Sequence, residues 1–134
     1  MATGKNVVVY PIVQILTPLY NEEKCFDTYV ETVERVLLSR QDVEYRCLLV
    51  DDGSTDGTWE LIQQQCRASP RFRGLRLSRN FGAHAAETAG LDLCDADAVA
   101  ILPADLQVPA RSHPFFRRGL AQRRRCGVRS SPNA

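Results

Sequence analysis

Two glycine-rich motifs that mark common phosphate-binding proteins are missing from this sequence of 134 residues. It contains neither G-x-x-x-x-G-K-S/T nor G-x-G-x-x-G, so P-loop nucleotide hydrolases and dinucleotide-binding Rossmann domains lose their main support. A long apolar run is also missing, because the stretch 98–104 is far shorter than the roughly 20 residues that a membrane-spanning helix needs. The first six residues are polar, and Pro11 and Gln14 break the apolar run behind them. We therefore expect neither a signal peptide nor a membrane-spanning segment.

Cysteine pairs at metal-binding or redox spacing are also absent. The five cysteines are Cys25, Cys47, Cys66, Cys94 and Cys126, an odd number without a C-x-x-C pair. Most of them fall inside segments that we predict to be helix or strand. This pattern favours reduced thiols in a cytosolic setting over a disulfide framework or a zinc site.

Acidic residues are missing from the last part of the chain. Residues 1–105 carry ten Lys and Arg against all sixteen Asp and Glu, whereas residues 106–134 carry seven Arg and no acid. We expect the segment 111–134 to be a basic tail that either binds anionic lipid headgroups or is simply solvated. Because aromatic residues are not interleaved with the arginines, we expect no nucleic-acid partner.

What is present is typical of one globular domain. With 44% hydrophobic and 25% charged residues, the chain has enough apolar material for a core. Apolar runs predict strands at 12–16, 47–50, 74–77 and 98–102, and helical periodicity predicts helices between them. We predict an α/β fold, a Rossmann-like, mainly parallel sheet with flanking helices, that covers residues 12–110 behind an N-terminal extension at 1–11.

The stretch 50–58, Val-Asp-Asp-Gly-Ser-Thr-Asp-Gly-Thr, carries the strongest functional signal. Its paired acids, Asp51 and Asp52, follow a buried strand, Gly53 permits a sharp turn, and Ser54 is one of several candidate N-cap residues for the next helix. Carboxylates at the end of a parallel strand can accept hydrogen bonds from ribose hydroxyls and base N–H groups. The alternative is a capped surface turn without a ligand.

The other polar clusters of the chain also follow predicted strands. Tyr20-Asn21-Glu22, Arg79-Asn80 and Asp105 with Gln107 each come directly after one, and Asn21 is a candidate N-cap of the first helix. A parallel sheet would bring all these clusters to one edge, which favours a nucleotide-type site. Asp105 and Gln107 offer two oxygen ligands of the kind that Mg²⁺ or Mn²⁺ prefers, although Asp105 can also be a helix cap.

Four segments together resemble the family-two glycosyltransferases of GT-A fold, especially the branch with dolichol-phosphate mannose synthases and polyprenyl-phosphate glucosyltransferases. They are 17–23 (TPLYNEE), 50–58 (VDDGSTDGT), 77–82 (LSRNFG) and 104–107 (ADLQ). The resemblance implies a UDP- or GDP-sugar donor and a divalent cation, Mg²⁺ or Mn²⁺, on its diphosphate. By position, the donor-binding residues would be Pro18, Tyr20, Asn21, Glu22, Asp51, Asp52, Gly53, Ser54, Arg79, Asn80 and Gly82, and the metal ligands Asp105 and Gln107.

The sequence departs from the family pattern in two places. The metal motif of the family usually reads Asp-Ala-Asp-Leu-Gln-Asp-Pro-Pro, and its first and third acids are here Pro103 and Val108. We therefore expect weak metal binding. The chain also has no counterpart of an acceptor-binding half after the metal motif, which suggests a truncated product. Catalytic residues stay unassigned.

We predict a glycosyltransferase domain that transfers a sugar to a polyprenyl phosphate or another membrane-associated acceptor. We expect it in the cytoplasm, at the cytoplasmic face of a membrane if the basic tail binds there. The alternative function is a catalytically inactive remnant that binds nucleotide or another protein.

Overall fold

The computed structural model describes residues 9–38 and 40–105, and in this part strands and helices alternate throughout. The elements are β1 (Ile12–Leu19), α1 (Phe26–Leu38), β2 (Glu44–Asp51), α2 (Thr58–Ala68), β3 (Phe72–Arg76), α3 (Ala83–Asp92) and β4 (Ala98–Ile101). The strands form one sheet in the order β3-β2-β1-β4, and every pair is parallel. The predicted α/β, Rossmann-like architecture is thus confirmed.

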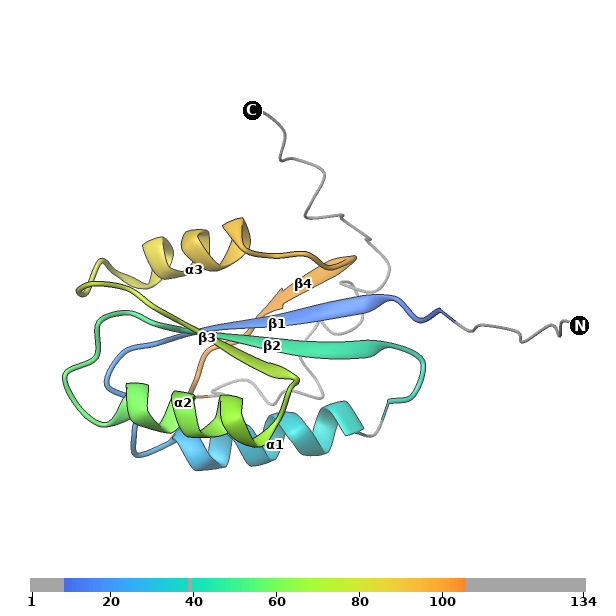
Figure 1. Cartoon of the computed structure of the whole chain (residues 1–134), viewed down its shortest axis with the longest axis horizontal. Helices are drawn as coiled ribbons and strands as arrows, with labels where there is room; N and C mark the ends of the chain where they lie inside the picture. Colours follow the sequence, from blue (N-terminus) through green and yellow to red (C-terminus); the bar gives the residue numbers. More distant parts are fainter. Residues whose placement is uncertain (1–8, 39, 106–134) are drawn as a thin grey trace, which may run out of the picture.

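Both faces of the sheet are covered by helices. Helices α1 and α2 lie on one face and α3 lies on the other (Figure 1). Alternate residues of a strand point to opposite faces, so Ile15 and Leu49 belong to the core under α1 and α2, whereas Leu16 and Leu48 belong to the core under α3. This two-sided burial explains why the strands appear in the sequence as continuous apolar runs.

Helix α3 packs closely against the sheet through a helix glycine. A Cβ atom at Gly90 would overlap the Leu16 side chain and would lie 3.2 Å from Cγ2 of Val50. Gly90 is therefore a point of close packing between α3 and the sheet.

Two predicted helix caps are wrong. Helix α1 begins at Phe26, five residues after Asn21, so Asn21 is not its N-cap. The N-cap of α2 is Gly57, without a side-chain capping bond, so neither Ser54 nor its two neighbours occupies that position. The strands are also longer than predicted at the start of the chain, because β1 continues through Pro18, which lies opposite Val50 of β2. Proline is tolerated there because Pro18 is the next-to-last residue of this ladder and lies beyond the part of β1 that pairs with β4.

The cysteines within the described residues are all free thiols, as predicted, and Cys126 lies outside that part. In the same part, no helix combines the length and the apolar character that crossing a membrane requires. The basic tail 111–134, Gln107 and Val108 fall outside the described residues as well.

Candidate functional site

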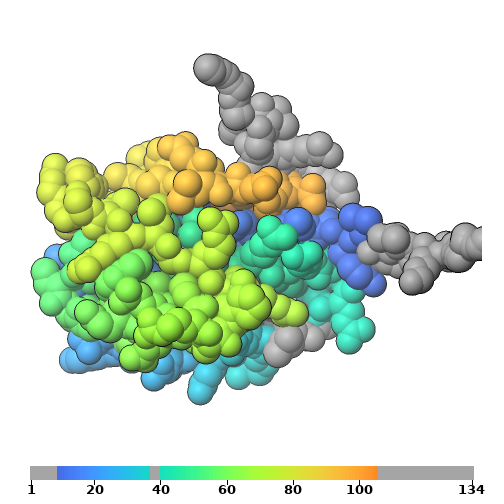
Figure 2. Space-filling model, viewed as in Figure 1, coloured from blue at the N-terminus to red at the C-terminus, as the bar shows by residue number. Residues whose placement is uncertain are grey.

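The carboxyl ends of the four strands lie at one edge of the sheet, on the left in Figure 1. Three connecting loops, 20–25, 52–57 and 77–82, leave the sheet at this edge and hold most of the predicted site residues. In the space-filling view of Figure 2 the segments that follow β2 and β3 lie together at that end of the molecule. We call this region the carboxyl edge.

Hydrogen bonds join the first loop to the second. Oδ1 of Asn21 accepts hydrogen bonds from the backbone N–H of Thr55 at 2.8 Å and of Asp56 at 3.3 Å. In return, the backbone N–H of Asn21 donates to Oγ of Ser54 at 2.8 Å, and that of Glu22 donates to Oγ1 of Thr58 at 2.9 Å. Asn21 has a positive φ of 53°, which asparagine tolerates better than most residues. Asn21 therefore joins two loops instead of capping a helix.

Asp51 is fully buried at the end of β2. Both of its carboxylate oxygens lie 3.3 Å from the backbone N–H of Ser54, which donates to them. Nε of Arg76 on the neighbouring strand lies 3.5 Å from Oδ2, and the guanidinium of Arg76 also lies over the Trp59 ring, 5.5 Å from its centroid. Asp51 thus turns the chain at the strand end, and its charge is balanced from β3.

Asp52 is almost as deeply buried, with 2% of its surface exposed. Its Oδ1 accepts a hydrogen bond from the backbone N–H of Phe81 at 2.8 Å, and Oδ2 accepts one from the backbone N–H of Gly82 at 3.0 Å. Nδ2 of Asn80 donates to Oδ2 as well, at 3.1 Å. The second loop is therefore joined to the third through one carboxylate.

The third loop presents an exposed cation and an exposed ring. The Arg79 guanidinium lies over the Phe81 ring, 4.1 Å from its centroid, and Phe81 is 46% exposed. Tyr20 of the first loop is similarly exposed, at 44%. Sequence reasoning singled out Arg79 and Tyr20 and missed Phe81, although the adjacent Arg, Asn, Phe and Gly of the quoted segment 77–82 could have indicated it.

The end of β4 forms an acidic corner with the first loop. Sγ of Cys25 lies 3.2 Å from Oε1 of Glu22, to which it donates, and the carbonyl of Ala104 lies 3.9 Å from the same sulfur. Burial, the hydrogen bond to Glu22 and the negative charges of Glu22 and Asp105 together raise the pKa of the Cys25 thiol to about 11. The thiol therefore stays protonated near neutral pH. Sequence reasoning gave Cys25 no role in the site.

The predicted metal ligands are only partly placed by this geometry. Asp105 lies at the carboxyl edge with an exposed side chain, and Gln107 lies outside the described residues. Within the described ranges, no group of three or more His, Cys, Asp or Glu side chains is arranged to hold a metal ion.

The fold and the edge define a class first: a Rossmann-like α/β domain with polar loops at the carboxyl edge, the fold of part of a GT-A glycosyltransferase. The chain belongs to glycosyl transferase family 2, whose sequence model matches residues 14–113. An undecaprenyl-phosphate 4-deoxy-4-formamido-L-arabinose transferase of Pseudomonas syringae pv. syringae (strain B728a) is 38% identical over 108 residues, which are 78% of this chain and 32% of the relative. The uncharacterized glycosyltransferase YkcC of Bacillus subtilis (strain 168) is 35% identical over 95 residues, 71% of this chain and 29% of its own. These matches confirm the resemblance stated above.

Solved structures show the same fold. A mannosyltransferase, PcManGT from Pyrobaculum calidifontis in complex with GDP-Man and Mn²⁺, superposes with a TM-score of 0.62 at 22% identity, over 72% of this chain and 28% of that one. The S. aureus protein TarS 1-349 in complex with UDP-GlcNAc gives a TM-score of 0.58 at 23% identity, over 69% and 26%. The chain spans about a third of the length of the first curated relative, 32%.

Proposed function

We propose that this chain forms the donor-binding half of a glycosyltransferase and binds a nucleotide-diphosphate sugar at the carboxyl edge. The observation that carries the proposal is the convergence of the three loops, which hydrogen bonds join into one surface. Open α/β sheets bind ligands beyond the carboxyl ends of their strands, where such loops meet. The donors bound by PcManGT and TarS, GDP-Man and UDP-GlcNAc, support the same class of ligand.

The proposed donor site combines residues that the sequence singled out with Phe81, which the structure adds. Tyr20 and Phe81 offer exposed rings to the base or the sugar, and Glu22 offers a carboxylate for ribose hydroxyls. Arg79 offers a cation for the diphosphate, and in the described part of the chain it makes no ion pair with an acidic side chain. Gly53 and Ser54 hold the backbone of these loops in place, and Pro18 lies near the end of β1, just before the first loop.

A divalent cation would bind at the acidic corner, held by Asp105 and Gln107 and by the donor diphosphate. Magnesium sites commonly use one or two carboxylates plus substrate phosphates, so a corner with few protein ligands fits this arrangement. Burial, the hydrogen bond to Glu22 and the negative charges of Glu22 and Asp105 raise the pKa of the Cys25 thiol, and a cation at the corner would offset those charges. When bound, the metal would stabilise the negative charge that develops on the departing diphosphate. The Mn²⁺ in the PcManGT complex supports this proposal.

The acceptor that we propose is a polyprenyl phosphate, as in the name of the undecaprenyl-phosphate transferase relatives. We propose that the basic tail 111–134 meets anionic lipid at the cytoplasmic face of the membrane, where such an acceptor would lie. Binding of the chain to vesicles with and without anionic phospholipid, compared with a variant in which Arg123, Arg124 and Arg125 are replaced by Gln, tests the role of the tail. Equal binding of the two chains would remove it from the proposal.

A second candidate function is nucleotide binding without sugar transfer. It is favoured by Pro103, which stands where the family usually has the first acid of its metal motif. Incubation with radiolabelled UDP- and GDP-sugars, polyprenyl phosphate and Mn²⁺ distinguishes sugar transfer from nucleotide binding without transfer. Label in the lipid fraction that disappears in Asp105→Ala would establish transfer, and donor binding without any lipid labelling would favour the second function.

Calorimetric titration tests the donor site directly. We expect UDP or GDP to bind more tightly than ADP, and Mn²⁺ to strengthen the binding. Asp105→Ala should remove the metal enhancement, and Pro103→Asp should increase it by restoring a carboxylate. If no nucleoside diphosphate binds with or without Mn²⁺, the proposed donor site is wrong.

A further inference from the structure

The Asp52 carboxylate has little capacity left for a ligand. A carboxylate offers about four acceptor positions. At Asp52, three donors already use them: the backbone N–H groups of Phe81 and Gly82 and the side-chain amide of Asn80. Only 2% of Asp52 is exposed. A base or a ribose could reach this carboxylate only by displacing the third loop from it.

The neighbouring glycine fixes the other end of the same loop. Gly53 has a φ of 73°, and a Cβ atom there would overlap the carbonyl carbon of Arg79 and lie 2.5 Å from the backbone nitrogen of Asn80. The second and third loops are therefore in backbone contact at Gly53 and bonded through side chain and backbone at Asp52. Both attachments lie within the third loop, directly before the start of α3.

The loop so held carries the cation of the proposed site. The Phe81 amide is bonded to Asp52, and the Phe81 ring lies under the Arg79 guanidinium. The position of Arg79 relative to β2 consequently depends on the Asp52 carboxylate. Among the described residues, Arg79 itself makes no hydrogen bond or ion pair with that carboxylate. Binding sites lose affinity when their charged groups must be ordered during binding.

We infer that Asp52 is a positioning residue, which acts on the donor by holding the loop 79–82 and with it Arg79, and does not contact the nucleotide. The part of this inference that concerns donor binding rests on the proposed function. It differs from the expectation drawn from the sequence, in which Asp52 hydrogen-bonds the base or ribose itself. The two roles predict different responses to the loss of the carboxylate.

Amide hydrogen exchange of the ligand-free chain tests the holding role without any nucleotide. In Asp52→Ala, the exchange rates of the Phe81 and Gly82 amides should rise roughly tenfold or more. This factor corresponds to the free energy lost with a hydrogen bond to a charged acceptor. Asp52→Asn keeps one acceptor oxygen, so one of the two amides should accelerate and the other should keep most of its protection. This milder variant decides the question if Asp52→Ala does not fold. Unchanged exchange at both amides in either folded variant would overturn the inference.

Asp97→Ala is the matched control, because Oδ2 of Asp97 accepts a backbone hydrogen bond from Ile12 at 2.8 Å at the opposite edge of the sheet. It loses a comparable carboxylate contact far from the loops. Exchange at Phe81 and Gly82 should stay at the parent rate in this variant. Acceleration there in Asp97→Ala would show that these amides report general loosening, and the inference would fall.

Calorimetry with UDP, GDP, uridine and inorganic pyrophosphate tests the effect on the donor. We expect Asp52→Asn to weaken both diphosphates and pyrophosphate by the same factor, and to leave uridine and the UDP-to-GDP preference unchanged. Arg79→Gln should weaken the same ligands, and the double variant should lose little more than Arg79→Gln alone. A changed base preference, or additive losses, would overturn the positioning role. If the parent binds none of these ligands, the proposed function and the donor's part of the inference fail together, whereas the exchange result stands independently.

Discussion

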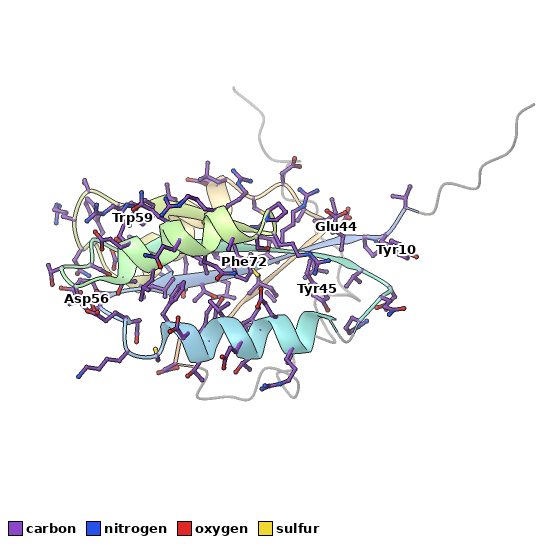
Figure 3. All side chains as sticks on the ribbon, turned by 60° about the horizontal axis from the view of Figure 1, so that its bottom comes forward. Tyr10, Glu44, Tyr45, Asp56, Trp59 and Phe72 are labelled. Carbon is purple, nitrogen blue, oxygen red and sulfur yellow. The ribbon has the colours of Figure 1, made fainter. Side chains whose placement is uncertain are left out.

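The loops at the carboxyl ends of the strands and those at the amino ends are held in different ways. At the carboxyl edge, the side chains of Asn21, Ser54 and Asp52 connect three loops to one another. At the amino edge, the main tie is between Asp97 and Ile12, whose backbone and side-chain atoms exchange hydrogen bonds at 2.9 and 2.8 Å. In Figure 3, Asp56 lies at the carboxyl edge, on the left, and Tyr10 and Glu44 lie at the amino edge, on the right.

The difference between the edges shows where the polar residues of this chain are used. Most side chains of the carboxyl edge that look like ligand-binding groups in the sequence hold loops in the structure, whereas Tyr20, Arg79 and Asp105 are exposed. At the amino edge, the pair Arg46 and Glu44 is exposed on both sides. Changes at the carboxyl edge should therefore affect both stability and binding, and changes at the amino edge should affect little.

The largest effect that we expect comes from Gly53→Ala. The substitution places a side chain at a positive φ and drives it into the backbone of Arg79 and Asn80, which cannot rotate away. Together these two penalties should lower the free energy of unfolding by about 3 kcal/mol or more. Urea denaturation measures the loss. Gly57→Ala is the control, because its Cβ would meet only the flexible Glu23 side chain. Equal losses in the two variants would contradict the tight contact between the loops.

Alkaline pH should destabilise the fold through two groups buried in its core, away from both edges of the sheet. Burial, assisted by the charge of Glu34, raises the pKa of the Cys47 thiol from 9.0 to about 12, and burial raises the pKa of the Tyr29 hydroxyl as well. The folded state therefore holds these protons after the unfolded state has released them. The stability they contribute is fully present below about pH 9 and is lost as the pH rises, by on the order of 1 kcal/mol per pH unit for Cys47.

Urea denaturation under reducing conditions between pH 8 and pH 11 measures this loss. Cys47→Ala removes one titrating group, so its stability should fall less steeply with pH than that of the parent chain. Parallel slopes for the two chains would contradict the buried, protonated state of Cys47.

Asn21 variants separate the backbone conformation of the first loop from its contacts with the second. Asn21→Gly keeps a positive φ accessible but loses the hydrogen bonds to Thr55 and Asp56, which we expect to lower the free energy of unfolding by about 1 kcal/mol. Asn21→Ala also strains the backbone and should lower it by roughly 1 kcal/mol more. Thermal unfolding of both variants gives the comparison. If the alanine variant proved as stable as the glycine variant, the positive φ at position 21 would not contribute to the difference in stability.

The smallest effect should come from the amino edge. Glu44→Gln removes the exposed ion pair with Arg46, whose Nη2 lies 3.0 Å from Oε2 of Glu44. Exposed pairs contribute little, so the free energy of unfolding should change by less than about 0.5 kcal/mol, and nucleotide binding should not change. A loss of unfolding free energy as large as that of the Asn21 variants would show that contacts at the two edges contribute equally to stability.

The fold was predictable from the sequence because its apolar runs and helical periodicities are local patterns. The runs around Ile15 and Leu49 indicate strands buried on both faces, and the order of strand and helix favours a parallel sheet. The gathering of the polar clusters at one edge follows from the same order. The helix caps were mispredicted, since Asn21 and Ser54 form hydrogen bonds across loops that local propensity does not describe.

The sequence by itself determined the family, the order of the elements and the edge at which the polar clusters gather, since motifs and periodicities depend only on neighbours along the chain. Only the tertiary structure decided the role of each polar group. Asp51 and Asp52 are adjacent and chemically identical, yet one is balanced by Arg76 of β3 and the other holds the backbone at Phe81 and Gly82. Those partners lie 25 to 30 positions along the chain, so only the packing of β3 beside β2 brings them to the two carboxylates.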